Sequence, residues 1–139
     1  NRGYLPITDN RMTRFNITLE ERTNFVFKCI EKMWGGEIFV PKIPSYKVTD
    51  VVKAINPKAK INITGIRPGE KKHEEMISID DAKNTLEFKD YFVIAPKSKF
   101  LNWNKKKYMK SHKNCSKENS KFLTPIEIRK ILKNSQIIY

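Results

Sequence analysis

The sequence predicts an α/β fold built from short strands and short helices. Its 139 residues are enough for one modest domain, and 39% of them are hydrophobic, which is enough to pack a core. Short apolar runs of period two alternate along the chain with amphipathic runs that follow helix-capping residues. No apolar run approaches the roughly 20 residues needed to cross a bilayer. We therefore expect an α/β domain and no membrane span.

The first elements are two extended stretches and an amphipathic helix. The extended stretches cover residues 4–8 and 12–17 and are separated by turn-prone residues. Thr18 and Glu21 then have the spacing of a capping box, in which each side chain accepts a hydrogen bond from the other residue's backbone. Apolar residues recur every three or four positions over residues 19–34, until Gly35-Gly36. This pattern predicts a helix over 19–34.

The middle of the chain predicts a strand, a second helix and another strand. Residues 37–40 favour a strand that stops at Pro41, because proline cannot donate to a strand ladder. Thr49 or Asp50 is expected to cap a short helix, which Asn56-Pro57 ends. Alternation over residues 61–63 favours a short strand.

The remaining elements follow the same signals. We expect one or two helical turns over residues 71–77, a short turn capped by Ser78, and a strand over 91–95. Thr124 has the position of an N-cap, with proline next and Glu127 three residues on, which predicts a terminal helix over 126–132.

The positive charge is concentrated in the last third of the chain. The formal net charge is +13, but residues 1–96 carry 16 basic and 13 acidic side chains, whereas residues 97–139 carry 12 and 2. Trp103 and Tyr108 lie among the lysines 105–107, as in a single-strand nucleic-acid binder. A solvated surface loop has the same composition and is the commoner case. We expect three parts: a substrate-binding domain over 1–96, a basic connector over 97–121 and a C-terminal helix over 122–139.

The cysteines and histidines do not predict a metal site. Cys29, Cys115, His73 and His112 lack the spacing of zinc ligands, and two distant cysteines do not form a disulfide framework. This cysteine usage favours a reducing, cytoplasmic location.

The most informative stretch for function is Arg67-Pro68-Gly69-Glu70. Proline and glycine favour a tight turn, and the ends supply a guanidinium and a carboxylate. A guanidinium fits two phosphate oxygens, and a carboxylate accepts hydrogen bonds from ribose hydroxyls, so the pair suits a nucleotide diphosphate. An arginine–glutamate pair that merely closes a surface turn is the alternative.

Arg14 is the second candidate. It lies within an otherwise apolar extended stretch, where a charge needs a partner. The sequence leaves two partners open, a phosphate or an acidic side chain.

Five runs in order resemble the C-terminal part of inverting UDP-N-acetylglucosamine 4,6-dehydratases, which are extended short-chain dehydrogenase/reductases. The runs are MTRF at 12–15, GEIFVPKIPS at 36–45, GIRPGEK at 65–71, HEEMIS at 73–78 and NTLEF at 84–88. The resemblance implies that Arg14 and Arg67 reach the UDP diphosphate and that Glu70 holds the ribose. It also implies NADP-dependent lyase chemistry in nucleotide-sugar, pseudaminic acid and surface-glycan biosynthesis, including flagellin glycosylation, and a homo-oligomeric parent enzyme.

The chain lacks the family's catalytic half. It has no glycine-rich phosphate loop and no Tyr-x-x-x-Lys pair. We therefore expect a fragment without the Rossmann core, which grips the UDP-sugar but is inactive alone, with NADP bound by a missing dinucleotide-binding half. The alternatives are a basic nucleic-acid or polyanion-binding module, which the modest charge of residues 1–96 disfavours, and an inactive truncated copy.

Overall fold

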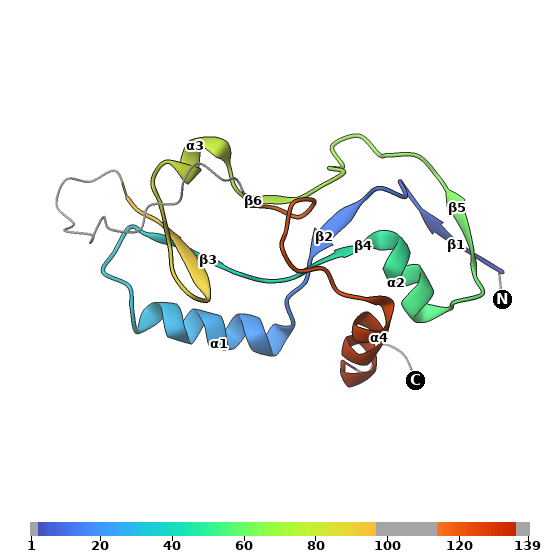
Figure 1. Cartoon of the computed structure of the whole chain (residues 1–139), viewed down its shortest axis with the longest axis horizontal. Helices are drawn as coiled ribbons and strands as arrows, with labels where there is room; N and C mark the ends of the chain where they lie inside the picture. Colours follow the sequence, from blue (N-terminus) through green and yellow to red (C-terminus); the bar gives the residue numbers. More distant parts are fainter. Residues whose placement is uncertain (1–2, 97–113, 136–139) are drawn as a thin grey trace. The chain divides into compact units, whose positions relative to one another are not determined.

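The computed structural model describes residues 3–96 and 114–135 (Figure 1). The chain forms two compact units that interleave along the sequence. Unit 1 consists of Asn1–Asn16, Pro44–Glu74 and Ser116–Tyr139, and unit 2 of Ile17–Ile43 and Glu75–Cys115. The boundary expected after residue 96 therefore differs from the division into compact units, because each unit draws on residues from both sides of it.

Unit 1 contains two strand pairs and two helices. A parallel pair joins β1 (Tyr4–Ile7) to β5 (Lys60–Ile63), an antiparallel pair joins β2 (Thr13–Phe15) to β4 (Ser45–Lys47), and the helices are α2 (Val48–Ile55) and α4 (Pro125–Asn134). The core lies between the two helices, where Ala54, Leu123 and Ile128 are buried against one another. Burial of these side chains fixes α4 on α2.

Unit 2 contains a three-stranded antiparallel sheet, a strand pair and two helices. The sheet has the order β3 (Ile38–Pro41), β8 (Tyr91–Ile94), β7 (Thr85–Glu87); the pair is β6 (Glu75–Ile77) with β9 (Asn114–Cys115); the helices are α1 (Leu19–Ile30) and α3 (Ile79–Ala82). Its core is small, with Val40, Ile77 and Ala82 buried together.

The predicted starts of three helices are confirmed, and in each of them a side chain caps the N-terminus. Thr18 and Thr124 both form capping boxes, with Glu21 and Glu127 respectively, and the Ser78 hydroxyl accepts the backbone N–H of Asp81. The first helix is shorter than predicted: α1 ends at Ile30, although Gly35 and Gly36 do adopt positive φ.

Two expectations about elements were wrong, and a third differs from the structure by one residue. Residues 71–77 hold no helical turn and instead contain β6, because Glu75 pairs with Cys115 far along the chain. Neither Thr49 nor Asp50 caps α2, which begins at Val48 after Lys47 without a side-chain cap. Strand β3 includes Pro41, which it tolerates because β3 lies at the edge of its sheet.

The expected connector contributes to both units. Of its residues, 97–113 lie outside the described part, but Asn114 and Cys115 form β9, and the side chains of Cys115 and Ser116 are buried. Within the described residues, no helix has the length and apolar character required to span a membrane.

Candidate functional site

The Arg67–Glu70 segment forms a closed turn. The backbone N–H of Glu70 donates to the Arg67 carbonyl at 3.0 Å, and Gly69 has a φ of 78°, which a side chain at this position would disfavour. The Glu70 carboxylate closes the same turn from the other direction, because its Oε2 accepts the Arg67 backbone N–H at 3.1 Å. Both ends of the turn are therefore held in place without using the Arg67 side chain.

The Glu70 carboxylate is anchored and retains acceptor capacity. Its Oε1 accepts the Thr8 hydroxyl at 3.1 Å, and its Oε2 accepts the Arg67 backbone N–H. An ionised carboxylate has about four acceptor positions, so roughly two stay available for further donors. This fits a carboxylate that holds a pair of hydroxyl groups.

The Arg67 side chain is exposed and, within residues 3–96 and 114–135, makes no hydrogen bond or ion pair. The alternative expected from the sequence, an arginine–glutamate pair that closes a surface turn, is present through the Arg67 backbone N–H and the Glu70 carboxylate, while the Arg67 guanidinium takes no part in it. The turn instead presents a cation toward solvent, next to a fixed acceptor.

Arg14 is engaged with the chain itself. From β2, its Nη1 donates to the carbonyls of Thr13 and Lys72, at 2.8 and 3.2 Å, and its Nη2 donates to the Lys71 carbonyl at 2.9 Å. Its Nε lies 3.5 Å from Glu74 Oε1. Of the two partners left open by the sequence, the structure contains the acidic one, together with three backbone carbonyls. These contacts bring Arg14 to the residues that directly follow Glu70.

Sequence reasoning missed a buried polar cluster beside these residues. The Thr13 hydroxyl lies 2.7 Å from the Ser116 hydroxyl and 2.9 Å from His73 Nδ1. Thr13 and Ser116 are only 4% and 0% exposed. Single hydroxyls give little sequence signal, and Ser116 lies about a hundred positions from Thr13, so only the fold could have identified this cluster.

The surroundings of His73 favour its neutral form. Partial burial lowers the pKa of the imidazole, and the charges of Lys117, Lys72 and Arg14 lower it further, against an opposing contribution from Asp9. A neutral His73 can accept a hydrogen bond at Nδ1 from Thr13.

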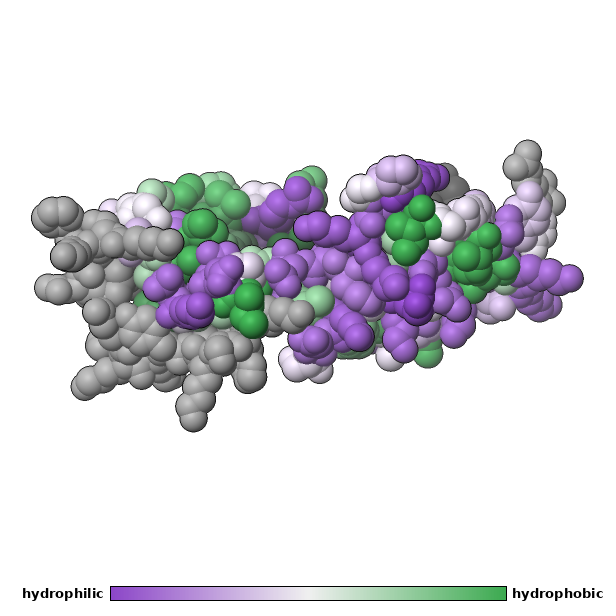
Figure 2. All heavy atoms as spheres, turned by 90° about the horizontal axis from the view of Figure 1, so that it is seen from above, coloured by the Kyte–Doolittle hydropathy of each residue, from purple (hydrophilic) through white to green (hydrophobic). Residues whose placement is uncertain are grey.

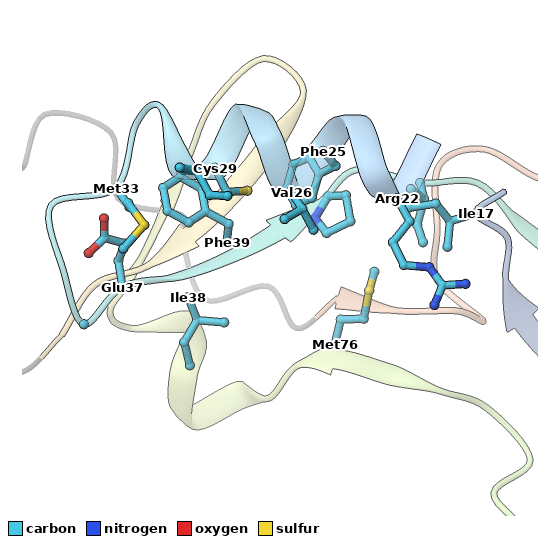
Figure 3. Close-up of a pocket in the computed structure, with 14 residues that line it drawn as sticks. Ile17, Arg22, Phe25, Val26, Cys29, Met33, Glu37, Ile38, Phe39 and Met76 are labelled. Atoms are coloured by element: carbon cyan, nitrogen blue, oxygen red, sulfur yellow. The ribbon is translucent and has the colours of Figure 1, made fainter. Parts of the chain in front are cut away.

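A separate apolar groove lies within unit 2. It encloses about 550 Å³ and is lined by α1, β3 and their neighbours. Phe25, Val26 and Cys29 come from α1, and Met76 points toward them from β6 (Figure 3). None of the 12 residues of α1 is buried. Exposed apolar side chains also appear as green patches among hydrophilic residues in the space-filling view (Figure 2).

The chain is similar to proteins that act on UDP-sugars, according to their names. It is 56% identical over 97 residues to a UDP-N-acetylglucosamine 4,6-dehydratase (inverting) of Campylobacter jejuni, a match that covers 70% of this chain and 29% of that protein. It is 34% identical over 105 residues to a UDP-glucose 4-epimerase of Rickettsia canadensis, covering 73% of this chain and 31% of the epimerase.

A solved structure with a similar fold is the X-ray structure of Pen from Bacillus thuringiensis. Its TM-score is 0.78 at 26% identity, and the match covers 99% of this chain and 42% of that chain. The chain thus spans less than a third of the two curated relatives and less than half of Pen.

The family follows from a match over most of the chain. Residues 1–96 match the family described as polysaccharide biosynthesis protein. This match confirms the family resemblance carried by the five sequence runs between residues 12 and 88. The chain belongs to the polysaccharide biosynthesis protein family.

Proposed function

We propose that this chain is the UDP-sugar-binding part of a UDP-N-acetylglucosamine 4,6-dehydratase that acts in nucleotide-sugar and surface-glycan biosynthesis, of the pseudaminic acid type. Arg67 contacts the diphosphate, Glu70 accepts hydrogen bonds from the ribose hydroxyls, and Arg14 supports the loop that carries them while facing the same phosphates. The chain is inactive alone, and its parent enzyme is a cytoplasmic homo-oligomer.

The observation that carries this proposal is the closed Arg67–Glu70 turn. It fixes a carboxylate with acceptor capacity beside an exposed guanidinium that has no partner among the described residues. Because the turn is already formed, binding a nucleotide costs little conformational entropy in the backbone. A diphosphate matches the fork of a guanidinium, and vicinal hydroxyls match a carboxylate.

The names of the relatives support UDP as the shared part of the ligand. One relative is named as a 4,6-dehydratase and the other as a 4-epimerase, and both names specify a UDP-sugar as the substrate. The two reactions on the sugar differ, whereas the nucleotide part of the substrate, UDP, is the same in both names. A segment that is similar to both proteins is therefore suited to bind the UDP part of the substrate.

The described residues do not fit a dinucleotide cofactor. Such a site needs a glycine-rich turn that leads into a helix N-terminus. The described helices instead follow Thr18, Lys47, Ser78 and Thr124, none of which belongs to such a turn. We therefore assign NADP to the dinucleotide-binding half of the parent enzyme.

The contribution of this chain to the reaction is orientation. Binding energy from the nucleotide, which does not react, holds the sugar at the catalytic groups of the other half. Arg67 and Glu70 therefore orient the sugar by binding the nucleotide, and they transfer no proton.

The test is the affinity of the 139-residue chain for UDP, measured by calorimetry. Arg67→Ala removes a charge-assisted contact of about 1.5–3 kcal/mol, so we expect the dissociation constant to rise roughly tenfold or more. Arg22→Ala is the matched control, because Arg22 is an exposed arginine of unit 2, and it should leave the affinity unchanged.

A second comparison separates this function from polyanion binding. Replacing lysines 105–107, which lie outside the described residues, by glutamine should leave UDP affinity unchanged. If these lysines rather than Arg67 control binding, and oligonucleotide affinity falls steeply with salt, the nucleic-acid alternative is correct and the proposal is wrong.

A further inference from the structure

We propose that Ser116 is a positioning residue for the UDP site, because its hydroxyl fastens β2 to the backbone that follows Glu70. This inference rests on the proposed function and extends it to a residue beyond the 1–96 segment that the family match covers. Strand β2 carries Arg14, and the backbone that follows Glu70 continues the turn that carries Arg67.

Ser116 makes hydrogen bonds to both segments from a fully buried position. Its Oγ accepts the backbone N–H of Glu74 at 2.9 Å, and its own N–H donates to the Glu74 carbonyl at 2.8 Å. On the β2 side, its Oγ lies 2.7 Å from Thr13 Oγ1 and 3.3 Å from the Thr13 carbonyl. The side chain is 0% exposed, so water cannot replace these bonds when the hydroxyl is removed.

The hydroxyls form a chain of short contacts that ends at His73. Glu74 N–H donates to Ser116 Oγ, Ser116 Oγ lies 2.7 Å from Thr13 Oγ1, and Thr13 Oγ1 lies 2.9 Å from His73 Nδ1. The Ser116 hydroxyl also donates to the Thr13 carbonyl at 3.3 Å. This chain of contacts fastens residues 73 and 74 to β2 at two points.

The chain of bonds continues to the proposed ligand-binding residues. Next to His73, the Lys72 carbonyl accepts the backbone N–H of Thr13 at 3.2 Å and a guanidinium N–H of Arg14, also at 3.2 Å. Two positions earlier lies Glu70, whose carboxylate sets the turn. Removal of the Ser116 hydroxyl leaves the Glu74 N–H without its acceptor, so this segment loses one of its attachments to β2 and the preorganisation of the site falls.

The experiment compares Ser116→Ala with Asn119→Ala in the full 139-residue chain. Asn119 lies in the same segment, and its side chain donates to Ser45 Oγ of β4 at 2.9 Å. We expect Ser116→Ala to weaken UDP binding roughly five- to tenfold, Asn119→Ala less than twofold, and Ser116→Thr, which keeps the hydroxyl, to stay near the wild-type value.

A second readout follows the His73 imidazole by NMR titration. Ser116→Ala removes the hydroxyl that contacts Thr13 Oγ1, and Thr13 Oγ1 in turn contacts His73 Nδ1, so the His73 pKa should change in Ser116→Ala and stay constant in Asn119→Ala. If Ser116→Ala does not fold, Thr13→Val removes the same hydroxyl pair from the β2 side and should give the same loss of affinity.

The outcomes are distinguishable. Equal UDP affinity of the wild type, Ser116→Ala and Thr13→Val overturns the positioning role and leaves the proposed function standing. An equal loss in Ser116→Ala and Asn119→Ala, with no change at His73, also overturns it, because general destabilisation then explains both. A wild-type chain that does not bind UDP overturns the proposed function and the positioning role together.

Discussion

Arg14 and Arg67 carry the same charged group, but the structure uses them differently. The Arg14 guanidinium donates to three backbone carbonyls and lies near Glu74, whereas the Arg67 guanidinium is exposed and makes no polar contact with the described residues. A cation already surrounded by acceptors gains less from an added phosphate than one surrounded by water alone. We therefore place the main phosphate contact at Arg67 and the main supporting role at Arg14.

The pKa of His73 gives a stability prediction with a definite sign. Because the folded state lowers this pKa, the unfolded state binds more protons between the folded value and the ordinary value of about 6.5. The stabilisation of the folded state that comes from a neutral His73 is complete above about pH 6.5. It is lost as the pH falls through this window. The urea midpoint should therefore be lower at pH 5.5 than at pH 7.5.

The matching control for this pH effect is His73→Gln, which keeps an acceptor for Thr13 but cannot titrate. The difference in midpoint between the two pH values should shrink in this variant. A wild-type midpoint that rises on going from pH 7.5 to 5.5, relative to His73→Gln, contradicts the assignment of a neutral, partly buried imidazole.

At the residue level, the sequence predicted which side chains are candidates but could not predict their partners. The guanidinium and carboxylate of the Arg67–Glu70 turn were identified because proline and glycine specify the turn locally. Three of the partners of Arg14 are backbone carbonyls, those of Thr13, Lys71 and Lys72, which every residue type possesses. The role of Ser116 depends on a contact with Thr13 that the sequence alone does not contain.

At the element level, the capping boxes were reliable, whereas the cap expected at Thr49 or Asp50 and the long-range pairing of strands were not. Thr18 and Thr124 cap helices as predicted, because a capping box involves residues only three positions apart. The prediction for residues 71–77 was wrong because β6 exists through its pairing with β9. Likewise, β4 forms by pairing with β2, and no local signal in the sequence predicted this strand.

The turn that carries Arg67 and Glu70 depends on the left-handed conformation of Gly69. A Cβ at Gly69 would contact nothing within 4 Å, so the cost of Gly69→Ala is purely conformational and should be about 1–2 kcal/mol. Because the turn shifts, UDP affinity should fall as well. Gly35→Ala is the matched control, since Gly35 also has a positive φ, of 123°, and an open Cβ position, but lies in unit 2.

Stability and binding separate these two variants. Both should lower the free energy of unfolding in urea, whereas only Gly69→Ala should weaken UDP binding. If Gly69→Ala binds UDP as tightly as Gly35→Ala does, the turn geometry is irrelevant to the ligand.

Helix α4 is stabilised by its N-cap, Thr124. Thr124→Ala removes the hydroxyl that accepts the Glu127 N–H, and should lower the free energy of unfolding by about 1 kcal/mol. Thr124→Ser keeps the hydroxyl and should lose much less. Equal losses in the two variants, measured by urea denaturation, would show that the hydroxyl does not stabilise the helix.

At the scale of the whole molecule, the apolar groove of unit 2 exposes side chains that a binding partner would bury. Val26, Ile30, Met33 and Ile38 line it and are each at least 50% exposed. The C. jejuni and R. canadensis relatives and Pen all extend well beyond the matched region, which covers 29–42% of their lengths. Under the function proposed above, this groove would pack against the dinucleotide-binding half of the parent enzyme, since burying this surface is favourable.

This docking is testable with the remaining part of the C. jejuni dehydratase, supplied as a separate chain. Val26→Lys, which places a charge in the groove, should abolish co-elution of the two chains in size-exclusion chromatography. Leu19→Lys is the control, because Leu19 lies on the same helix at 74% exposure and does not line the groove. Self-association of the wild-type chain that Val26→Lys abolishes, without binding to the added half, would assign the groove to a second copy instead.

The proposed nucleotide site is the Arg67–Glu70 turn. An NMR titration of the ¹⁵N-labelled chain with UDP can locate the bound nucleotide, because each backbone amide reports its own surroundings. We expect saturable shifts concentrated at residues 65–72 and on β2. Shifts confined to residues 97–113 or to α1, or no saturable shifts at millimolar UDP, would contradict it.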